Sequence, residues 1–532
     1  MAGVSVSRVL RRLGPLGVAA AFALVLAFAA LAAPGDLDPT FGTGGRVILS
    51  PGVESYATAA ANQPDGKLLL AGLVDDREPP PPPPPAPNAL RIPSGDFLAV
   101  RLNANGSPDS SFGAGGFVRT PVDLGPSGYD VARAVATGPG GTVVLAGDAG
   151  TAFGSLDLAF VRYTSTGALD SSFSDDGIQT VDVGTFDSVA GVAVQTDGKV
   201  VAAGRGEAGF TLVRLRADGS LDPTFGSGGI VDTPIGDPSV RDEASAVTLL
   251  GDGRILVAGT ADYDYRAQTD FALVRYLPSG ELDPSFGSGG IVVTPSAGDD
   301  VAGGMALTPS GAIIVAGYGG GGAFRLVRYL RSGALDPGFG RAGIVTTQIG
   351  TLYADARAVW VQADGRVIAG GTTRDRPPAV WDEMAVVRYN ADGSPDTSFG
   401  QGGRQTFDLL AGHDLGWALV VQPGAVTGRS TDRLVLAGRA SDGDGLADHV
   451  AAVGIELGPL TQPPPPTRCR VPRVVHKRLA TARSRIRRAN CSVGRIRRVR
   501  ARRFRGRVVA QSPRPGRVLR QGARVNLVVG RR

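Results

Sequence analysis

The chain repeats one glycine-rich phrase seven times, and this repetition limits its fold more than any other feature. The phrase reads LDPTFGSGG at Leu221–Gly229, and variants of it begin at residues 37, 107, 169, 282, 335 and 394. Successive copies lie 52 to 71 residues apart when measured at the phenylalanine of each copy. Those phenylalanines are Phe41, Phe112, Phe173, Phe225, Phe286, Phe339 and Phe399. A period of this length predicts an array of similar structural units.

Each unit contains four short apolar runs in a constant order. In residues 242–294 the runs are DEASAVTLL, ILVAG, DFALVRY and IVVTP, and turns rich in Gly, Asp and Pro separate them. Short runs bounded by such turns are typical of β-strands, and the 78 glycines of the chain fit tight turns between strands. Four strands per repeat of about sixty residues predict an all-β fold in which each unit is one blade of a β-propeller.

The two ends of the array complement each other. The final unit supplies strands from Gly416, Asp432 and His449, and then stops without its closing phrase or its fourth strand. The N-terminus supplies both, because LDPTFGTGG is followed by RVILS at Arg46–Ser50. A solenoid would leave two open ends that need polar caps, whereas pairing the two ends removes the exposed edges. We therefore expect a seven-bladed propeller of four-stranded blades, closed by the N-terminal strand.

An arginine and an aspartate recur at fixed places in the units. Near the end of the third strand stand Arg101, Arg162, Arg214, Arg275, Arg328 and Arg388, and the phrase that follows contributes Asp109, Asp170, Asp222, Asp283, Asp336 and Asp396. We expect each pair to meet across the turn, because a partly buried arginine and carboxylate orient each other. The phenylalanine ring of the phrase is expected to pack between neighbouring blades. The last unit has Ala452–Gly454 at this place and lacks both members of the pair, while the N-terminal phrase adds Asp38.

The repeated segments are similar to a known family. DGKLLLAG (Asp65–Gly72), GSLDPTFGSGG (Gly219–Gly229) and DFALVRY (Asp270–Tyr276) resemble the delta-60 repeats of bacterial proteins, and the resemblance covers residues 36–457. It implies a β-propeller and no defined biochemical activity. The alternative for the phrase is a phosphate-binding loop, which should open a helix. Because a Val- or Ile-rich strand follows the phrase instead, we interpret it as structural.

The chain offers few residues for catalysis. It has three histidines and contains no P-loop, no HExxH motif and no Cys–His arrangement, and no G-x-S-x-G elbow stands beside His413 or His449. An enzyme is therefore the second hypothesis, as a carboxylate-dependent hydrolase or lyase acting at the propeller mouth. No cofactor is expected, with calcium as the alternative. Asp442, Asp444 and Asp448 resemble part of a calcium loop that lacks its first ligand and its terminal glutamate.

The first 33 residues predict a secretory signal. Arg8, Arg11 and Arg12 precede an apolar run from Leu13 to Leu31, and Ala30-Leu31-Ala32 with its neighbour Ala33 supplies an A-x-A cleavage site at its end. A basic start, an apolar middle and a small-residue end are the features of a cleaved signal peptide. The apolar run is also near the length of a membrane span, so a retained anchor is the alternative. We expect contact with the membrane only through this segment.

Charge divides the rest of the chain. Residues 34–466 hold 29 basic and 49 acidic residues, a net charge of −20, whereas residues 467–532 hold 23 basic residues and no acidic residue. Such asymmetry indicates two domains with different partners. The predicted boundaries are 34–457 for the propeller, 458–467 for a proline-rich linker and 468–532 for a basic domain.

The basic domain is similar to a PASTA domain. Its matching features include Val471-Pro472, Gln511–Pro513 and Val525–Val529, together with a predicted helix over 478–490. Strands are expected at 493–499, 507–511 and 524–529. PASTA domains occur on bacterial cell-wall enzymes and kinases, and some bind peptidoglycan, so the resemblance implies peptidoglycan or an anionic wall polymer as the partner. His476 departs from the family pattern, because it replaces the usual glycine after the first strand.

The arginines of the basic domain are the candidate contacts for such a polymer, because Coulomb attraction draws a positive surface to anionic polymers. The contacts predicted are Arg487, Arg488, Arg497, Arg498, Arg502 and Arg503. Nucleic acid is not expected, because Phe504 alone is available for base stacking. A surface without a partner and docking on the acidic propeller stay open as alternatives. Cys469 and Cys491 also lie here, and in an exported protein they are expected to form a disulfide.

These patterns together predict an extracellular bacterial protein that is secreted or attached to the cell wall. Its function is predicted to be binding or scaffolding without catalysis. The ligand of the propeller is not identified by the sequence.

Overall fold

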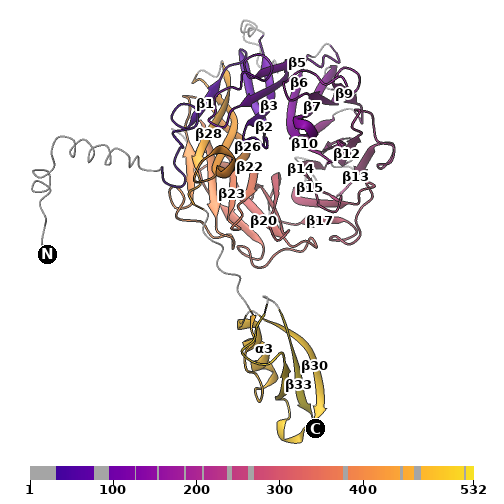
Figure 1. Cartoon of the computed structure of the whole chain (residues 1–532), viewed down its shortest axis with the longest axis vertical. Coiled ribbons are helices and arrows are strands. Elements are labelled where there is room, and N and C mark those ends of the chain that lie inside the picture. Colours follow the sequence, from indigo (N-terminus) through magenta and orange to yellow (C-terminus); the bar gives the residue numbers. More distant parts are fainter. Residues whose placement is uncertain are drawn as a thin grey trace, which may run out of the picture. The chain divides into compact units, whose positions relative to one another are not determined.

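The computed structural model of the chain divides into two compact units, residues 1–460 and 461–532 (Figure 1). The structure describes residues 32–76, 95–125, 128–152, 155–184, 187–206, 209–235, 242–261, 269–296, 298–375, 381–443, 447–459, 469–489, 491–519 and 523–531. The predicted signal over residues 1–33 falls almost wholly outside them. No described helix combines the length and the apolar character that crossing a bilayer requires.

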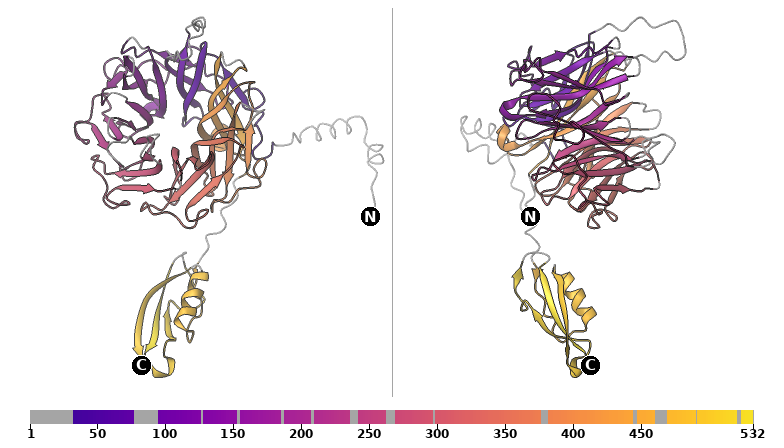
Figure 2. Two further views of the ribbon diagram at one scale, coloured as in Figure 1. Left: turned by 180° about the vertical axis from the view of Figure 1, so that it is seen from behind. Right: turned by 90° about the vertical axis from the view of Figure 1, so that its right-hand side faces the viewer.

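The described part of the first unit forms seven four-stranded antiparallel blades around a common axis (Figures 1 and 2). The first two blades comprise β2 (Glu54–Asn62), β3 (Leu68–Asp75), β4 (Asp96–Leu102), β5 (Phe117–Thr120), β6 (Asp130–Thr137), β7 (Val143–Ala152), β8 (Ser155–Tyr163) and β9 (Ile178–Val181). The third and fourth comprise β10 (Ser188–Val194), β11 (Val200–Arg205), β12 (Phe210–Leu215), β13 (Ile230–Thr233), β14 (Glu243–Leu249), β15 (Ile255–Ala261), β16 (Asp270–Tyr276) and β17 (Ile291–Thr294).

The remaining blades follow the same order. The fifth and sixth comprise β18 (Val301–Leu307), β19 (Ile313–Gly319), β20 (Ala323–Tyr329), β21 (Ile344–Thr347), β22 (Tyr353–Val361), β23 (Val367–Arg374), β24 (Asp382–Tyr389) and β25 (Arg404–Phe407). The seventh comprises β26 (Asp414–Gln422), β27 (Arg433–Ser441), β28 (Asp448–Glu456) and β1 (Arg46–Leu49). Two short helices, η3 (Pro139–Gly141) and α2 (Gly424–Thr427), lie in turns.

The N-terminal strand closes the ring, as the sequence predicts. Strand β1 pairs antiparallel with β28, from Arg46 opposite Val453 to Leu49 opposite Val450. The seven-bladed propeller and its closure are therefore confirmed. Strand β1 thus gives the last blade its fourth strand and covers the edge of β28, which would otherwise be free to recruit another strand.

Each boundary between blades is held by the same group of side chains, which we call the latch. In the third blade, Arg214 Nε donates to Asp222 Oδ2 at 2.8 Å, and the guanidinium carbon lies 4.4 Å from the centre of the Phe225 ring. The equivalent arginine donates to the phrase aspartate at 2.7 to 2.9 Å in the other five units that contain the pair. A cation over an aromatic face adds an electrostatic attraction to the ion pair.

The latch reaches into the next blade. Arg214 Nη1 donates to the carbonyl oxygen of Pro278 at 2.7 Å, and the amide of Gly226 donates to Ser279 at 2.9 Å. Gly280 has a φ of +92°, and a Cβ there would lie 3.0 Å from the nitrogen of Gly226. The Phe225 ring packs in a buried cluster with residues of both the third and the fourth blade. One repeated phrase thus fixes a turn and joins two blades.

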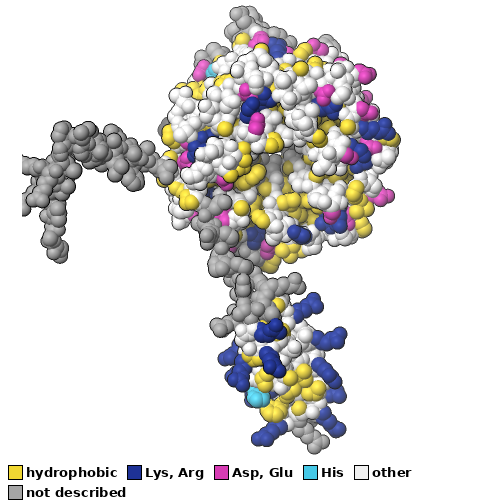
Figure 3. All heavy atoms as spheres, viewed as in Figure 1, with side chains coloured by type: hydrophobic (Ala, Val, Ile, Leu, Met, Phe, Trp, Pro, Cys, Tyr) yellow, Lys and Arg dark blue, Asp and Glu magenta, His cyan; other side chains and the backbone are white. Residues whose placement is uncertain are grey.

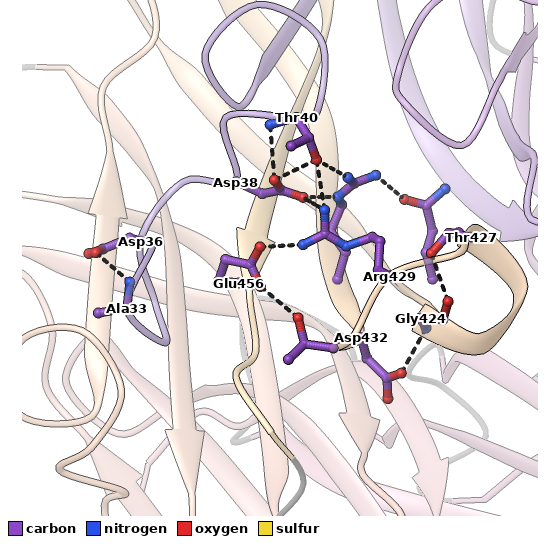
Figure 4. Close-up of polar contacts among 12 residues, drawn as sticks. Ala33, Asp36, Asp38, Thr40, Gly424, Thr427, Arg429, Asp432 and Glu456 are labelled. Atoms are coloured by element: carbon purple, nitrogen blue, oxygen red, sulfur yellow. Dashed lines mark hydrogen bonds and ion pairs between the residues drawn. The ribbon is translucent and has the colours of Figure 1, made fainter. Parts of the chain in front are cut away.

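At the seventh boundary the structure corrects a prediction from the sequence. The last unit was expected to lack the arginine–aspartate pair, but a pair is present. Arg433 at the start of β27 takes the place of the missing arginine and bonds to Asp38. Its guanidinium carbon lies 5.0 Å from the Phe41 ring centre, and Nη1 donates to Ala104 of the first blade. Arg429 adds a second contact to Asp38 at 2.7 Å (Figure 4). The pair is kept because an adjacent strand supplies the cation.

The second unit is a small α+β domain. It contains β29 (Cys469–Arg470), α3 (Leu479–Arg488), β30 (Ser492–Arg500), η4 (Arg502–Phe504), β31 (Val508–Ser512), β32 (Val518–Leu519) and β33 (Arg524–Arg531). Strand β33 lies between β30 and β31, parallel to the former and antiparallel to the latter. The helix buries Ala482 and Ile486 against Val508 and Leu527. His476 has a φ of +66° and stacks on Phe504, with ring centres 5.1 Å apart.

Replacing the latch phenylalanine is expected to destabilise the propeller. Phe225 is fully buried, and Phe225→Ala should lower the free energy of unfolding by about 3–5 kcal/mol because it opens a cavity between blades. Leu335→Ala in another copy of the phrase is the control, since Leu335 is 38% exposed and surface changes stay within about 0.5 kcal/mol. Urea unfolding measures both. Equal effects would contradict a structural role for the ring.

The latch carboxylates are expected to make the propeller sensitive to acid. Burial alone raises the pKa of Asp222, but hydrogen bonds from Thr224 and Lys199 and the charge of Arg214 outweigh it and hold the pKa far below its usual range. Such a group stabilises the folded state above the unfolded pKa, near 3.9, and this contribution is lost as the pH falls through the folded pKa. Urea unfolding at pH values from about 5 downwards measures the free energy of unfolding. This free energy should fall less with decreasing pH in Asp222→Asn than in the parent chain.

Candidate functional site

The central channel of the propeller is a cavity lined by all seven blades. Its volume is about 710 Å³, and the first strand of every blade contributes to its wall: β2, β6, β10, β14, β18, β22 and β26. Every one of these strands contains a β-bulge at the same position of its pairing with the second strand. A bulge leaves one residue unpaired and re-aims its side chain. The seven bulged residues are Thr58, Arg133, Ala190, Ser245, Gly303, Arg357 and Trp417.

These seven residues, which we call the bulge ring, differ from blade to blade. The latch, in contrast, repeats in the arginine, the aspartate and the phenylalanine. If a position in the repeat is required for the fold, the same residue type is expected there in every blade, as is found for the latch. The bulge ring therefore lines the channel with six different residue types, whereas the latch repeats the same three.

Two arginines of the bulge ring are held by buried carboxylates. Arg133 Nε donates to Asp148, whose side chain is fully buried, while the Arg133 side chain is 37% exposed. Arg357 bonds in the same way to Asp355, with 50% of the arginine side chain and 6% of the aspartate exposed. Burial lowers the pKa of Arg133, but Asp148 and Tyr129 outweigh this effect and raise it, so the charge is permanent. The guanidinium groups are therefore partly exposed at the channel surface, while the aspartates that neutralise them are buried.

A single carboxylate, Glu243, is found among the described residues that line the channel. Burial raises its pKa, and the charges of Arg205, Arg133 and Arg357 act against that rise. Tyr56 and Trp417 meet edge to face nearby, with ring centres 5.4 Å apart. Paired acids, which a hydrolase or lyase would use, are not found in this lining. The arrangement suits binding by charge and aromatic contact.

The sequence-predicted calcium loop is not assembled by the described residues. Asp442 lies 3.6 Å from Nε2 of His449, and Asp448 lies 2.7 Å from Nε of Arg439. Asp444 falls outside the described residues. The groups of three or more possible metal ligands that the described residues form lie elsewhere and involve neither Asp442 nor Asp448. Calcium binding at this loop stays a prediction.

The predicted polymer contacts lie on the second unit. Arg497, Arg498 and Arg503 are exposed, whereas the side chains of Arg487, Arg488 and Arg502 fall outside the described residues. Figure 3 shows basic side chains and no acidic ones on the visible face of this unit. The described exposed basic residues are Arg473, Lys477, Arg478, Arg483, Arg485, Arg495, Arg497, Arg498, Arg500, Arg503, Arg505, Arg507, Arg514, Arg517, Arg524 and Arg531.

Family comparison identifies both units. The family described as "Domain of unknown function (DUF5122) beta-propeller" matches residues 92–112, 139–173, 195–225, 250–286, 308–339 and 362–399, and the PASTA domain family matches residues 470–531. The chain is a DUF5122 β-propeller protein with a C-terminal PASTA domain. The resemblances drawn from the repeats and the basic domain are thereby confirmed. PASTA domains are linked to peptidoglycan binding and are typically extracellular or periplasmic in bacteria.

Solved structures similar to the DUF5122 propeller protein share little of its sequence. An ulvan lyase of a polysaccharide lyase family is 12% identical, with a TM-score of 0.39 over 80% of this chain and 95% of its own. An α-L-arabinofuranosidase from Fusarium graminearum is 13% identical, with a TM-score of 0.38 over 67% and 98%. An α-L-arabinanase from Penicillium chrysogenum is 14% identical, with a TM-score of 0.37 over 81% and 99%. These scores are too low to support an argument on function. No curated protein matches the chain.

The predicted disulfide of the PASTA domain has a direct test. Cys491 is buried at the end of the helix, while the side chain of Cys469 falls outside the described residues. Thiol alkylation of the denatured, non-reduced chain should label neither cysteine, and prior reduction should expose both. Cys469→Ser is expected to expose Cys491 without reduction, and to cost the domain about 2–5 kcal/mol of unfolding free energy. Full labelling of the untreated chain would contradict the pairing.

Proposed function

We propose that this protein is an exported binding or scaffold protein of the bacterial cell envelope. Its PASTA domain engages peptidoglycan or the anionic polymers attached to it, and its propeller presents a ligand surface at the central channel. The observation that carries the proposal is a PASTA domain whose described surface exposes sixteen basic side chains and whose sequence from residue 467 onwards has no acidic residue.

The electrostatics of the domain support an anionic partner. No ion pair between a basic side chain of this unit and a carboxylate occurs within its described residues. Its exposed arginines therefore keep their full attraction for an external polyanion, over a range set by the ionic strength. A wall polymer offers many anionic groups along one chain and can meet several arginines together.

The channel supports binding rather than catalysis for the propeller. Its described lining offers two arginines, one glutamate and an edge-to-face aromatic pair. A general acid and base pair would need two carboxylates at a fixed separation. Fixed guanidinium groups and aromatic faces instead provide recognition of a ligand by charge and stacking. Binding of the PASTA domain to the cell wall can be tested without knowing which ligand the propeller binds.

Removing basic side chains from the PASTA domain is expected to weaken retention on purified peptidoglycan. The variant Arg497→Gln, Arg498→Gln, Arg503→Gln should raise the apparent Kd by about tenfold or more, since each basic residue near an anionic surface contributes about 1 kcal/mol. The control carries Arg46→Gln, Arg216→Gln and Arg341→Gln, three exposed propeller arginines, and loses the same charge. Co-sedimentation at low salt measures both.

Further arms separate the two kinds of partner. A chain ending at Gln462 should not be retained, and retention equal to that of the full chain would overturn the proposal. Raised salt should weaken the electrostatic part of the binding. Peptidoglycan stripped of its attached anionic polymers distinguishes the sources: unchanged retention points to the peptidoglycan itself, and lost retention points to the attached polymer.

A further inference from the structure

The PASTA domain carries a stacked pair of aromatic rings at its surface. His476 lies in the turn before α3, and Phe504 ends η4. The two ring centres are 5.1 Å apart, and the ring planes make an angle of 10°. His476 is exposed and Phe504 is half-buried. The pair therefore presents a flat aromatic surface to the solvent.

Phe504 is not used to build the apolar core of the domain. It is the single Phe, Tyr or Trp of residues 467–532, and aromatic rings commonly supply much of the area that a core buries. The core of the described residues is instead formed mainly by aliphatic side chains around Ile486, Val508 and Leu527. Packing of the core therefore does not account for the position of this ring, and aromatic rings at a surface are typical of binding sites.

The backbone at His476 does not need a side chain. Its φ is +66°, where glycine is the default residue and a side chain costs free energy. Backbone hydrogen bonds fix the turn in this conformation: the amide of His476 donates to Val508 at 2.7 Å, and the amide of Val508 donates to Lys477 at 2.9 Å. A glycine would satisfy this turn with less strain. The imidazole is therefore explained by what its ring contacts and not by the fold of the turn.

Basic side chains lie in the same two turns. Arg507 Nη1 donates to the carbonyl oxygen of His476 at 3.1 Å, which places the guanidinium beside that residue. Lys477, Arg478 and Arg505 are neighbours of the two rings in the chain, and all three are exposed. A sugar ring fits such a surface, because its C–H groups pack on an aromatic face while its oxygens accept hydrogen bonds from the basic groups.

We propose that His476 and Phe504 form a saccharide-binding subsite that stacks on a sugar ring of the peptidoglycan glycan strand, with Arg507 donating to an oxygen of the same sugar. This inference rests on the wall-binding function proposed above and chooses between its two partners. Charge alone attracts any anionic polymer of the wall. A stacking face needs a ring, and the glycan strand is a continuous chain of sugar rings.

Three substitutions of His476 separate the ring from the backbone and from the imidazole. His476→Gly and His476→Asn suit the left-handed backbone and remove the ring. Both should raise the Kd of the full chain for peptidoglycan stripped of its attached polymers by about fivefold or more, the usual effect of removing an anchor residue. His476→Phe keeps a ring and should bind as the parent does. Co-sedimentation measures the Kd, and thermal unfolding of the same chains controls for loss of folding.

Salt provides a readout that distinguishes stacking from charge. Salt screens attraction between charges but not the contact between rings. The ratio of the Kd of His476→Asn to that of the parent should therefore be the same at low and at raised salt. The effect of the variant Arg497→Gln, Arg498→Gln, Arg503→Gln should shrink as salt is raised. A His476→Asn effect that disappears at raised salt would overturn the stacking proposal.

Failure of the subsite and failure of wall binding give different results. If the parent binds stripped peptidoglycan and both His476→Gly and His476→Asn bind equally well, the subsite is overturned and the proposed function stands. Weakened binding in His476→Phe as well as in His476→Asn would overturn stacking, because it would assign the contact to the imidazole nitrogens. Retention of the parent on unstripped peptidoglycan alone would overturn the glycan strand as the partner, and no retention on either preparation would overturn both proposals.

Discussion

The propeller depends on a buried ion pair that lies over an aromatic ring and recurs at the boundaries between blades. A blade of four strands has two apolar faces and cannot bury them alone, and each of the seven clusters that form the propeller core contains residues of two neighbouring blades. The latch arginine bonds to its own aspartate, covers the phenylalanine and donates to the next blade. Removing one part therefore leaves a buried charge or a cavity between blades.

Ring closure shows how firmly this arrangement is required. The last blade has glycine at the place of the latch arginine, and a Cβ on Gly454 would lie 2.7 Å from Cβ of Phe41. The Phe41 ring therefore packs directly against the backbone of β28, and Arg433 reaches Asp38 from the adjacent strand. Arg433 therefore makes the ion pair that the third-strand arginine makes in the other blades. This substitution indicates that the fold requires the ion pair, and not an arginine at one particular position of the repeat.

The residues that hold the blades together are separate from the residues that line the channel. The latch repeats the same residue types, because every boundary poses the same packing problem. The bulge ring varies, because the channel wall is not needed to join the blades.

The sequence alone determined the repeat, the number of blades and the strand that closes them, because period, turn residues and alternating runs are local patterns that hydrophobic burial and edge pairing must satisfy. It also determined the latch pairs, which lie eight residues apart, and the likeness of the basic domain to PASTA. Tertiary structure alone decided that Arg433 pairs with Asp38, since 395 residues separate them, and that seven bulged residues face one channel. Such contacts arise where distant segments are packed together, and no spacing along the chain records them.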